Sequence, residues 1–149
     1  MTELSDCFAR KLLTNTGPST GLARKSLKQA EIFLVDAVDL INMGKSRMAT
    51  IALYNAFFHT ARTLLFRDGI KERSHFCIAR YVEEKYVRKG LLKADFLGYL
   101  DALRDARHET QYSLEVLTME IDMGTAVEIC RKFMKAVEGL IDKKYGFLS

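Results

Sequence analysis

An arginine occupies the end of an apolar helical stripe, where a hydrophobic side chain is expected. Phe96, Leu100 and Leu103 recur at steps of three and four residues, as on the buried face of an amphipathic helix. The next position on that face is Arg107. A guanidinium does not lose its proton in a protein, so a buried one needs a carboxylate or another anion beside it. The pattern therefore singles out Arg107 as a candidate phosphate-binding residue.

Two neighbours of Arg107 bear on what such a site does. Tyr112 lies five positions further on and could hydrogen-bond a phosphate or stack on a base. In the structural alternative, Arg107 pairs with a helix end or with a carboxylate such as Glu109, and Tyr112 packs over it. His108 has the side chain best suited to proton transfer near neutral pH. Together with Arg104, it also fits an ordinary solvated helix face.

A second group of polar residues lies in an unusually apolar helical segment. Asn55, His59 and Arg62 follow one another at i, i+4 and i+7 and therefore share one helix face. They either line a polar groove between subunits or satisfy buried backbone groups and one another. Further along, Ser74 and His75 stand where a helix begins. Ser74 is expected to cap that helix, and His75 to close a local hydrogen-bond network.

The sequence predicts neither a metal site nor a cofactor. The three histidines are far apart and form no H-x-x-x-H or H-E-x-x-H pattern, and no glycine-rich phosphate loop is present. Three widely spaced cysteines, Cys7, Cys77 and Cys130, include no C-x-x-C pair. Reduced thiols are expected rather than a disulfide framework or a zinc site.

The composition indicates a single globular domain. The chain has 149 residues, of which 48% are hydrophobic and 28% charged, and its net charge of +4 permits a nucleic acid or nucleotide as partner. No apolar run approaches the ~20 residues of a membrane span. The first residues, MTELSDCFARKLL, do not resemble a secretion signal. The protein is therefore expected in the cytoplasm, with no membrane partner.

The elements that must position these residues are helices. One proline and nine glycines leave little room for a turn-rich β fold, and long segments follow a helical period. We predict an all-α, up-and-down antiparallel bundle of about five helices. The helices are expected over residues 22–42, 47–66, 75–89, 93–113 and 124–143. Residues 1–20 are expected to form an N-terminal extension with a short helix near 7–13, residues 21–143 the bundle, and residues 144–149 a frayed tail.

Four blocks in this order resemble the HEPN domains of the small stand-alone prokaryotic type. They are KSLKQAEIFLVDAVDLI (25–41), ATIALYNAFFHTARTLLF (49–66) with the turn Asp68–Gly69, RSH (73–75) and ARHETQY (106–112). The resemblance covers about residues 26–141. It implies a five-helix bundle, commonly a homodimer whose cleft is built from paired copies of the arginine-bearing helix. Many small members are encoded beside a minimal nucleotidyltransferase that acts as antitoxin.

The chain departs from the motif of the active family members. Those members are metal-independent ribonucleases, often toxins, that carry Arg-x(4–6)-His, whereas Tyr112 stands here in place of the histidine. His108 follows Arg107 directly, and each residue rotates a helical side chain by ~100°. Tyrosine, with an unperturbed pKa near ~10, is a poor general base at neutral pH. The Arg-x-x-x-x-Tyr form resembles the branch of the family regarded as binding modules for nucleotides or RNA.

Three hypotheses follow from these residues and from the resemblance. The first is a homodimeric module that binds nucleotide, RNA or a minimal nucleotidyltransferase as partner. Its candidate ligand-binding residues are Arg107, Tyr112, His59, Arg62, His75 and Asn55. The second is a metal-independent ribonuclease in which Arg107 stabilises the phosphate and His108, or His59 of a partner subunit, moves protons. The third is a structural bundle without a ligand.

Overall fold

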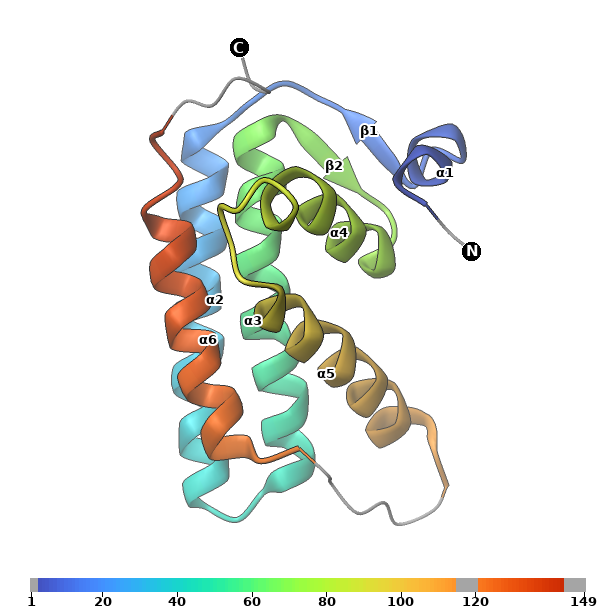
Figure 1. The fold of residues 1–149 in the computed structure, drawn as a ribbon. Helices are drawn as coiled ribbons and strands as arrows, with labels where there is room; N and C mark the ends of the chain where they lie inside the picture. Colours follow the sequence, from blue (N-terminus) through green and yellow to red (C-terminus); the bar gives the residue numbers. More distant parts are fainter. Residues whose placement is uncertain (1–2, 115–120, 144–149) are drawn as a thin grey trace.

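The computed structural model describes residues 3–114 and 121–143 and confirms the all-α class. Six helices and one π-helical segment, η1, make up most of this part of the chain. The helices are α1 (Leu4–Ala9), α2 (Thr20–Asn42), α3 (Ser46–Asp68), α4 (His75–Val82), α5 (Ala94–Tyr112) and α6 (Met123–Glu138), and η1 (Glu83–Val87) continues α4. Helices α2, α3 and α6 lie side by side along their lengths, α5 leans away from them, and α4 crosses near one end of α3 (Figure 1).

Helix α3 is the centre of the bundle because it is buried on most of its surface. It packs against α2, α4, α5 and α6. Small residues such as Ala52, Ala56 and Ala61 let these helices approach closely. Its larger side chains, including Leu53 and Phe57, fill the core between them. The apolar segment that the sequence analysis singled out therefore carries most of the packing.

The ends of α2 and α3 follow signals present in the sequence. Ser19 caps α2, since its Oγ accepts the backbone N–H of Leu22 at 3.0 Å. Gly69 ends α3 in the left-handed region, with φ of 78°. A Cβ on Gly69 would lie 2.6 Å from the backbone of Gly17 and Pro18. This position therefore needs glycine for its conformation and for the close passage of the N-terminal segment.

A short antiparallel ladder joins the N-terminal segment to the bundle. Strand β1 (Leu13–Asn15) pairs with β2 (Ile70–Glu72), with Leu13 opposite Glu72. The backbone N–H of Arg73 adds a hydrogen bond of 2.8 Å to the carbonyl of Leu12. This ladder was not predicted from the sequence, because strands of three residues have too short a pattern and their pairing depends on segments far apart in the chain.

Several predicted helix ends are displaced in the structure. The helix expected over 75–89 is α-helical only to Val82 and then continues as the π-helical η1. The last helix begins at Met123 and ends at Glu138, five residues earlier than the predicted end at 143. The first short helix ends at Ala9, since Lys11 adopts a φ of 58°. The tail predicted over 144–149 lies outside the described residues.

The prediction of reduced thiols is wrong for two of the three cysteines. Cys7 of α1 and Cys77 of α4 form a disulfide between positions 70 residues apart, and Cys130 is free and buried. The pairing results from the packing of α1 against α4. Sequence spacing carries no sign of that contact, because neither cysteine belongs to a local motif.

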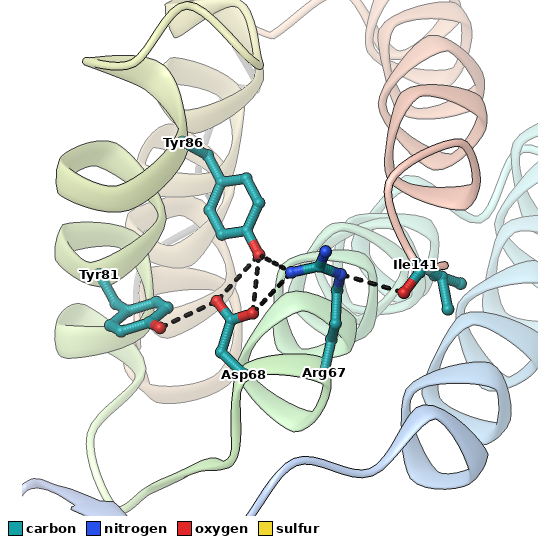
Figure 2. A network of polar contacts seen from close by, with 5 residues as sticks. All are labelled: Arg67, Asp68, Tyr81, Tyr86 and Ile141. Carbon is teal, nitrogen blue, oxygen red and sulfur yellow. Dashed lines mark hydrogen bonds and ion pairs between the residues drawn. The ribbon is translucent and has the colours of Figure 1, made fainter. Parts of the chain in front are cut away.

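A buried polar network joins the ends of three helices (Figure 2). The side chains of Arg67 and Asp68, at the end of α3, are almost fully buried and form an ion pair of 2.9 Å. Asp68 accepts hydrogen bonds of 2.9 Å from Tyr81 and 2.8 Å from Tyr86. Arg67 Nε donates to the carbonyl of Ile141, just beyond α6, at 3.0 Å. The network thus fastens α3 to α4, η1 and the end of α6.

Candidate functional site

Arg107 lies on α5 and faces an aromatic ring of α3. Its Cζ is 4.8 Å from the centroid of the Tyr54 ring, a cation–π distance. The Nε atom of Arg107 is buried, and it has no hydrogen-bond partner within residues 3–114 and 121–143. In the same part of the chain Arg107 forms no ion pair, and the carboxylate pairing considered with Glu109 is absent. The guanidinium therefore retains its capacity to bind an anion.

Tyr54 connects Arg107 to the first residue of α4. The Tyr54 hydroxyl lies 2.7 Å from Nδ1 of His75. The His75 ring also packs against Phe58, with ring centroids 4.2 Å apart. Ser74 caps α4 through its Oγ, which accepts the N–H of Cys77 at 3.3 Å. The RSH block thus places an imidazole beside the arginine, and the expected cap at Ser74 is confirmed.

The environment keeps both partners of this hydrogen bond uncharged at neutral pH. Burial raises the pKa of Tyr54 to about 12 against the opposing effect of Arg107 and Arg104. Partial burial, followed by the positive charges of Arg107, Arg104 and Arg62, lowers the pKa of His75. In the tautomer in which the neutral phenol donates to Nδ1 of the neutral imidazole, the ring carries its own proton on Nε2. His75 would thus present an N–H group to a ligand.

Arginines outnumber carboxylates where α4 faces α5. Asp101 of α5 forms ion pairs with Arg104 at 2.9 Å and with Arg80 at 2.9 Å. Both guanidinium groups lie close to the Phe76 ring, whose centroid is 5.0 Å from Arg80 Cζ and 5.3 Å from Arg104 Cζ. Arg80 also pairs with Glu83 at 3.7 Å, so two carboxylates face the three arginines Arg80, Arg104 and Arg107. The surface between α4 and α5 keeps an excess of positive charge, as an anion-binding site requires.

His59 and Arg62 lie beside this site on α3. Arg62 forms an ion pair with Glu72 of β2 and lies over the Phe66 ring at 4.7 Å. His59 stacks on Phe33 of α2, with ring centroids 5.5 Å apart and planes within 5°. Burial, followed by the charges of Arg62 and His75, lowers the pKa of His59 to about 4. Packing and pairing occupy both side chains, which therefore shape the site more than they offer free binding groups.

The remaining candidate residues lie apart from the pair of Tyr54 and His75. Asn55 donates to the carbonyl of Ile51 on its own helix at 2.9 Å, as in the structural interpretation of that residue. His108 and Tyr112 contact each other near the end of α5, with ring centroids 4.9 Å apart. Tyr112 is 66% exposed. His108 directly follows Arg107 and Tyr112 lies five residues beyond it, and the two form a separate exposed pair.

Sequence reasoning missed Tyr54 and Phe58 as site residues. Both stand on the helix face of Arg62, at i, i+4 and i+8. This periodicity was available in the sequence. Their apolar rings, however, fit the helix core equally well, and only the position of α4 shows that Tyr54 meets His75.

The described residues hold no cluster of three or more histidines, cysteines or carboxylates arranged for a metal ion. Among those same residues, no helix is long and apolar enough to cross a bilayer.

The fold and site define a small helical module with a cationic, aromatic-lined surface. Residues 23–140 match the model of the HEPN domain. The chain therefore belongs to the HEPN family, and this membership supports a role related to nucleotides or RNA at the level of the family.

A curated relative is the UPF0332 protein PH1297 of Pyrococcus horikoshii, which is 30% identical over 90 residues. The alignment covers 60% of this chain and 63% of that relative, so the chain spans less than two thirds of the relative's length.

Proposed function

We propose that this protein is a nucleotide- or RNA-binding module that takes a phosphate group at Arg107. The observation that carries the proposal is the guanidinium of Arg107, which has a buried Nε and no carboxylate partner in the described residues. The planar guanidinium group can donate two parallel N–H hydrogen bonds to two oxygens of a phosphate. His75 supplies an N–H donor beside it, and Arg104 adds positive charge. Phosphate contacts of this kind give affinity without sequence specificity.

The proposal extends to the assembly. Members of the family often dimerise. We propose a cytoplasmic homodimer that works with a minimal nucleotidyltransferase in a toxin–antitoxin arrangement. The exposed pair of His108 and Tyr112 lies near the end of α5, on a surface open to a second subunit or to that partner. Tyr112 there offers a hydroxyl and a ring for a phosphate or a base.

Ligand titration tests the binding module. Binding of a fluorescein-labelled single-stranded oligoribonucleotide and of adenosine diphosphate is measured in EDTA by anisotropy and calorimetry. Arg107→Ala is expected to weaken binding by about tenfold or more, the loss of one charge-assisted contact. Arg131→Ala is the matched control, because Arg131 is an exposed arginine of α6 paired with Glu128. Equal affinities of wild type and Arg107→Ala would refute the proposal.

The ribonuclease remains as a second function because of the state of His75. In the tautomer in which Nδ1–H of His75 donates to the Tyr54 hydroxyl, the free Nε2 would act as a general base, and Arg107 would stabilise the charge that develops on a phosphate. The test is incubation of pure protein with mixed RNA in EDTA. Cleavage that disappears in Arg107→Ala, His75→Ala or His108→Ala would establish the ribonuclease. A stable protein that neither cleaves RNA nor binds a ligand would support the third hypothesis, a structural bundle without a ligand.

A further inference from the structure

The disulfide joins an extension of this chain to the helix that begins the candidate site. Cys7 precedes the part of the chain that matches the family, residues 23–140, whereas Cys77 lies within it. Cys77 follows directly after Phe76 and stands two positions after His75 on α4. The covalent bond therefore fixes α1 against the helix that carries the imidazole of the proposed site.

A cleft of about 620 Å³ separates α1 from α4 and η1. Four residues of the N-terminal segment form one wall, namely Glu3, Leu4, Ser5 and Phe8. The opposite wall carries three cations and two carboxylates, so it keeps a net positive charge; its residues are Phe76, Arg80, Glu83, Glu84, Lys85 and Arg88. Phe76 and Arg80 also belong to the arginine cluster around Asp101, because the Phe76 ring contacts both Arg80 and Arg104. The position of α1 thus decides how much of the cationic surface is open beside the site.

The N-terminal segment is held by the ladder, by the disulfide and by the partly buried side chains of Leu4 and Phe8, which act on different parts of it. The ladder of β1 with β2 holds Leu13–Asn15, and Leu13 is 1% exposed. The disulfide holds α1, which lies outside the bundle formed by α2, α3 and α6 (Figure 1). A helix of six residues is not stable by itself in water, so α1 depends on its contact with α4. Loss of the disulfide would therefore free α1 while β1 stays paired.

We propose that the Cys7–Cys77 disulfide is a redox switch that regulates access to the anion-binding surface of α4 and α5. The inference rests on the proposed function. The oxidised protein holds α1, with the carboxylate of Glu3, in front of Arg80 and Phe76. Reduction releases α1, removes that negative charge and exposes the arginines. The reduced protein then binds phosphate-bearing ligands more tightly.

The switching reaction is thiol–disulfide exchange with a dithiol reductant. A thiolate of the reductant attacks one sulfur of the disulfide and forms a mixed disulfide, and the other protein sulfur leaves as a thiolate and takes up a proton. The second thiol of the reductant then displaces the remaining protein sulfur, which also becomes a thiol. Two electrons and two protons pass to Cys7 and Cys77, and the reductant leaves as a disulfide. Both cysteines are buried, so the reaction proceeds through local opening of the short α1.

The first measurement follows the chemistry and the motion without any ligand. Protein without reductant and protein treated with dithiothreitol are alkylated under denaturing conditions and weighed by mass spectrometry. The untreated protein should carry one alkyl group, at Cys130, and the treated protein three. Hydrogen exchange should rise on the order of tenfold in Leu4–Ala9 after reduction, while the amides of Leu13–Asn15 stay protected. Full alkylation without reductant, or unchanged exchange in α1, would overturn the switch.

The second measurement asks whether the motion regulates binding. The labelled oligoribonucleotide should bind about threefold or more tightly to the reduced protein. Cys7→Ser should bind at the reduced level under both conditions, and the control Cys130→Ala should keep the redox response of wild type. Released α1 with unchanged affinity would overturn the regulation. Absence of any binding would instead refute the proposed function, and hydrogen exchange would still report on the switch. Reduced wild type serves in place of Cys7→Ser if that variant does not fold.

Discussion

The Tyr54 hydroxyl lies 2.7 Å from Nδ1 of His75 and ties the middle of α3 to the first residue of α4. The same ring supports the guanidinium of Arg107 from α5 at 4.8 Å. Tyr54 therefore contacts two different helices through two parts of its side chain, the polar hydroxyl and the aromatic face. The orientation of His75 and the position of Arg107 both depend on this one residue.

Removal of the Tyr54 hydroxyl should release His75 and leave Arg107 in place. Tyr54→Phe keeps the ring and loses the hydrogen bond, so we expect a cost of about 1 kcal/mol in the free energy of unfolding. Nitrogen NMR of His75 should show the loss of its preference for the proton on Nε2. Tyr99→Phe is the control, because Tyr99 stacks on Phe57 and its hydroxyl has no partner in the described residues. An unchanged His75 spectrum would contradict the assigned hydrogen bond.

His59 should make the protein less stable in mild acid. Its pKa is lowered from 6.5 to about 4 in the folded protein, so between these values the unfolded chain binds more protons. The contribution of neutral His59 is fully present above pH 6.5 and is lost as the pH falls toward 4. His59→Gln should flatten this part of the stability profile, measured by urea unfolding at several pH values. A slope identical to that of wild type would show that His59 is not the titrating group.

The ion pair of Arg67 and Asp68 should be costly to break. Asp68→Asn removes the carboxylate from a buried arginine and weakens the hydrogen bonds of Tyr81 and Tyr86. We expect a loss on the order of 3 kcal/mol in the free energy of unfolding. Asp142→Asn is the matched control, since Asp142 pairs with Arg24 at an exposed site, where the cost should stay below about 1 kcal/mol. Similar losses in the free energy of unfolding for the two variants would contradict the idea that burial makes the Arg67–Asp68 pair costly to break.

Gly69 should tolerate a side chain less well than Gly44. Both glycines have a positive φ, 78° and 73°, so alanine is strained at either position. Only at Gly69 would the added Cβ also collide with the backbone of Gly17 and Pro18. Gly69→Ala should therefore cost about 1–3 kcal/mol more than Gly44→Ala, measured by thermal or urea unfolding. Equal losses in the free energy of unfolding for the two variants would show that the backbone at Gly17 and Pro18 moves aside without strain.

Much of the candidate site was accessible from the sequence because it follows helical periodicity. The stripe through Phe96, Leu100 and Leu103 predicted the buried face of α5, and all three residues are buried. The break in that stripe singled out Arg107. The structural alternative for Arg107 assumed a carboxylate such as Glu109, and periodicity could not decide between this and a free guanidinium. That decision required the positions of all neighbouring helices.

The sequence by itself determined the helices, the serine caps of α2 and α4 and the arginine at the end of the buried face of α5, because these properties depend on residues within a few positions of one another. The tertiary structure decided which side chains meet. Tyr54 and His75 are separated by 21 residues and Cys7 and Cys77 by 70, and neither pair carries a local pattern. Their contacts arise from how α1 and α4 pack on the bundle. That packing is a sum of many small burial energies, and no single motif encodes it.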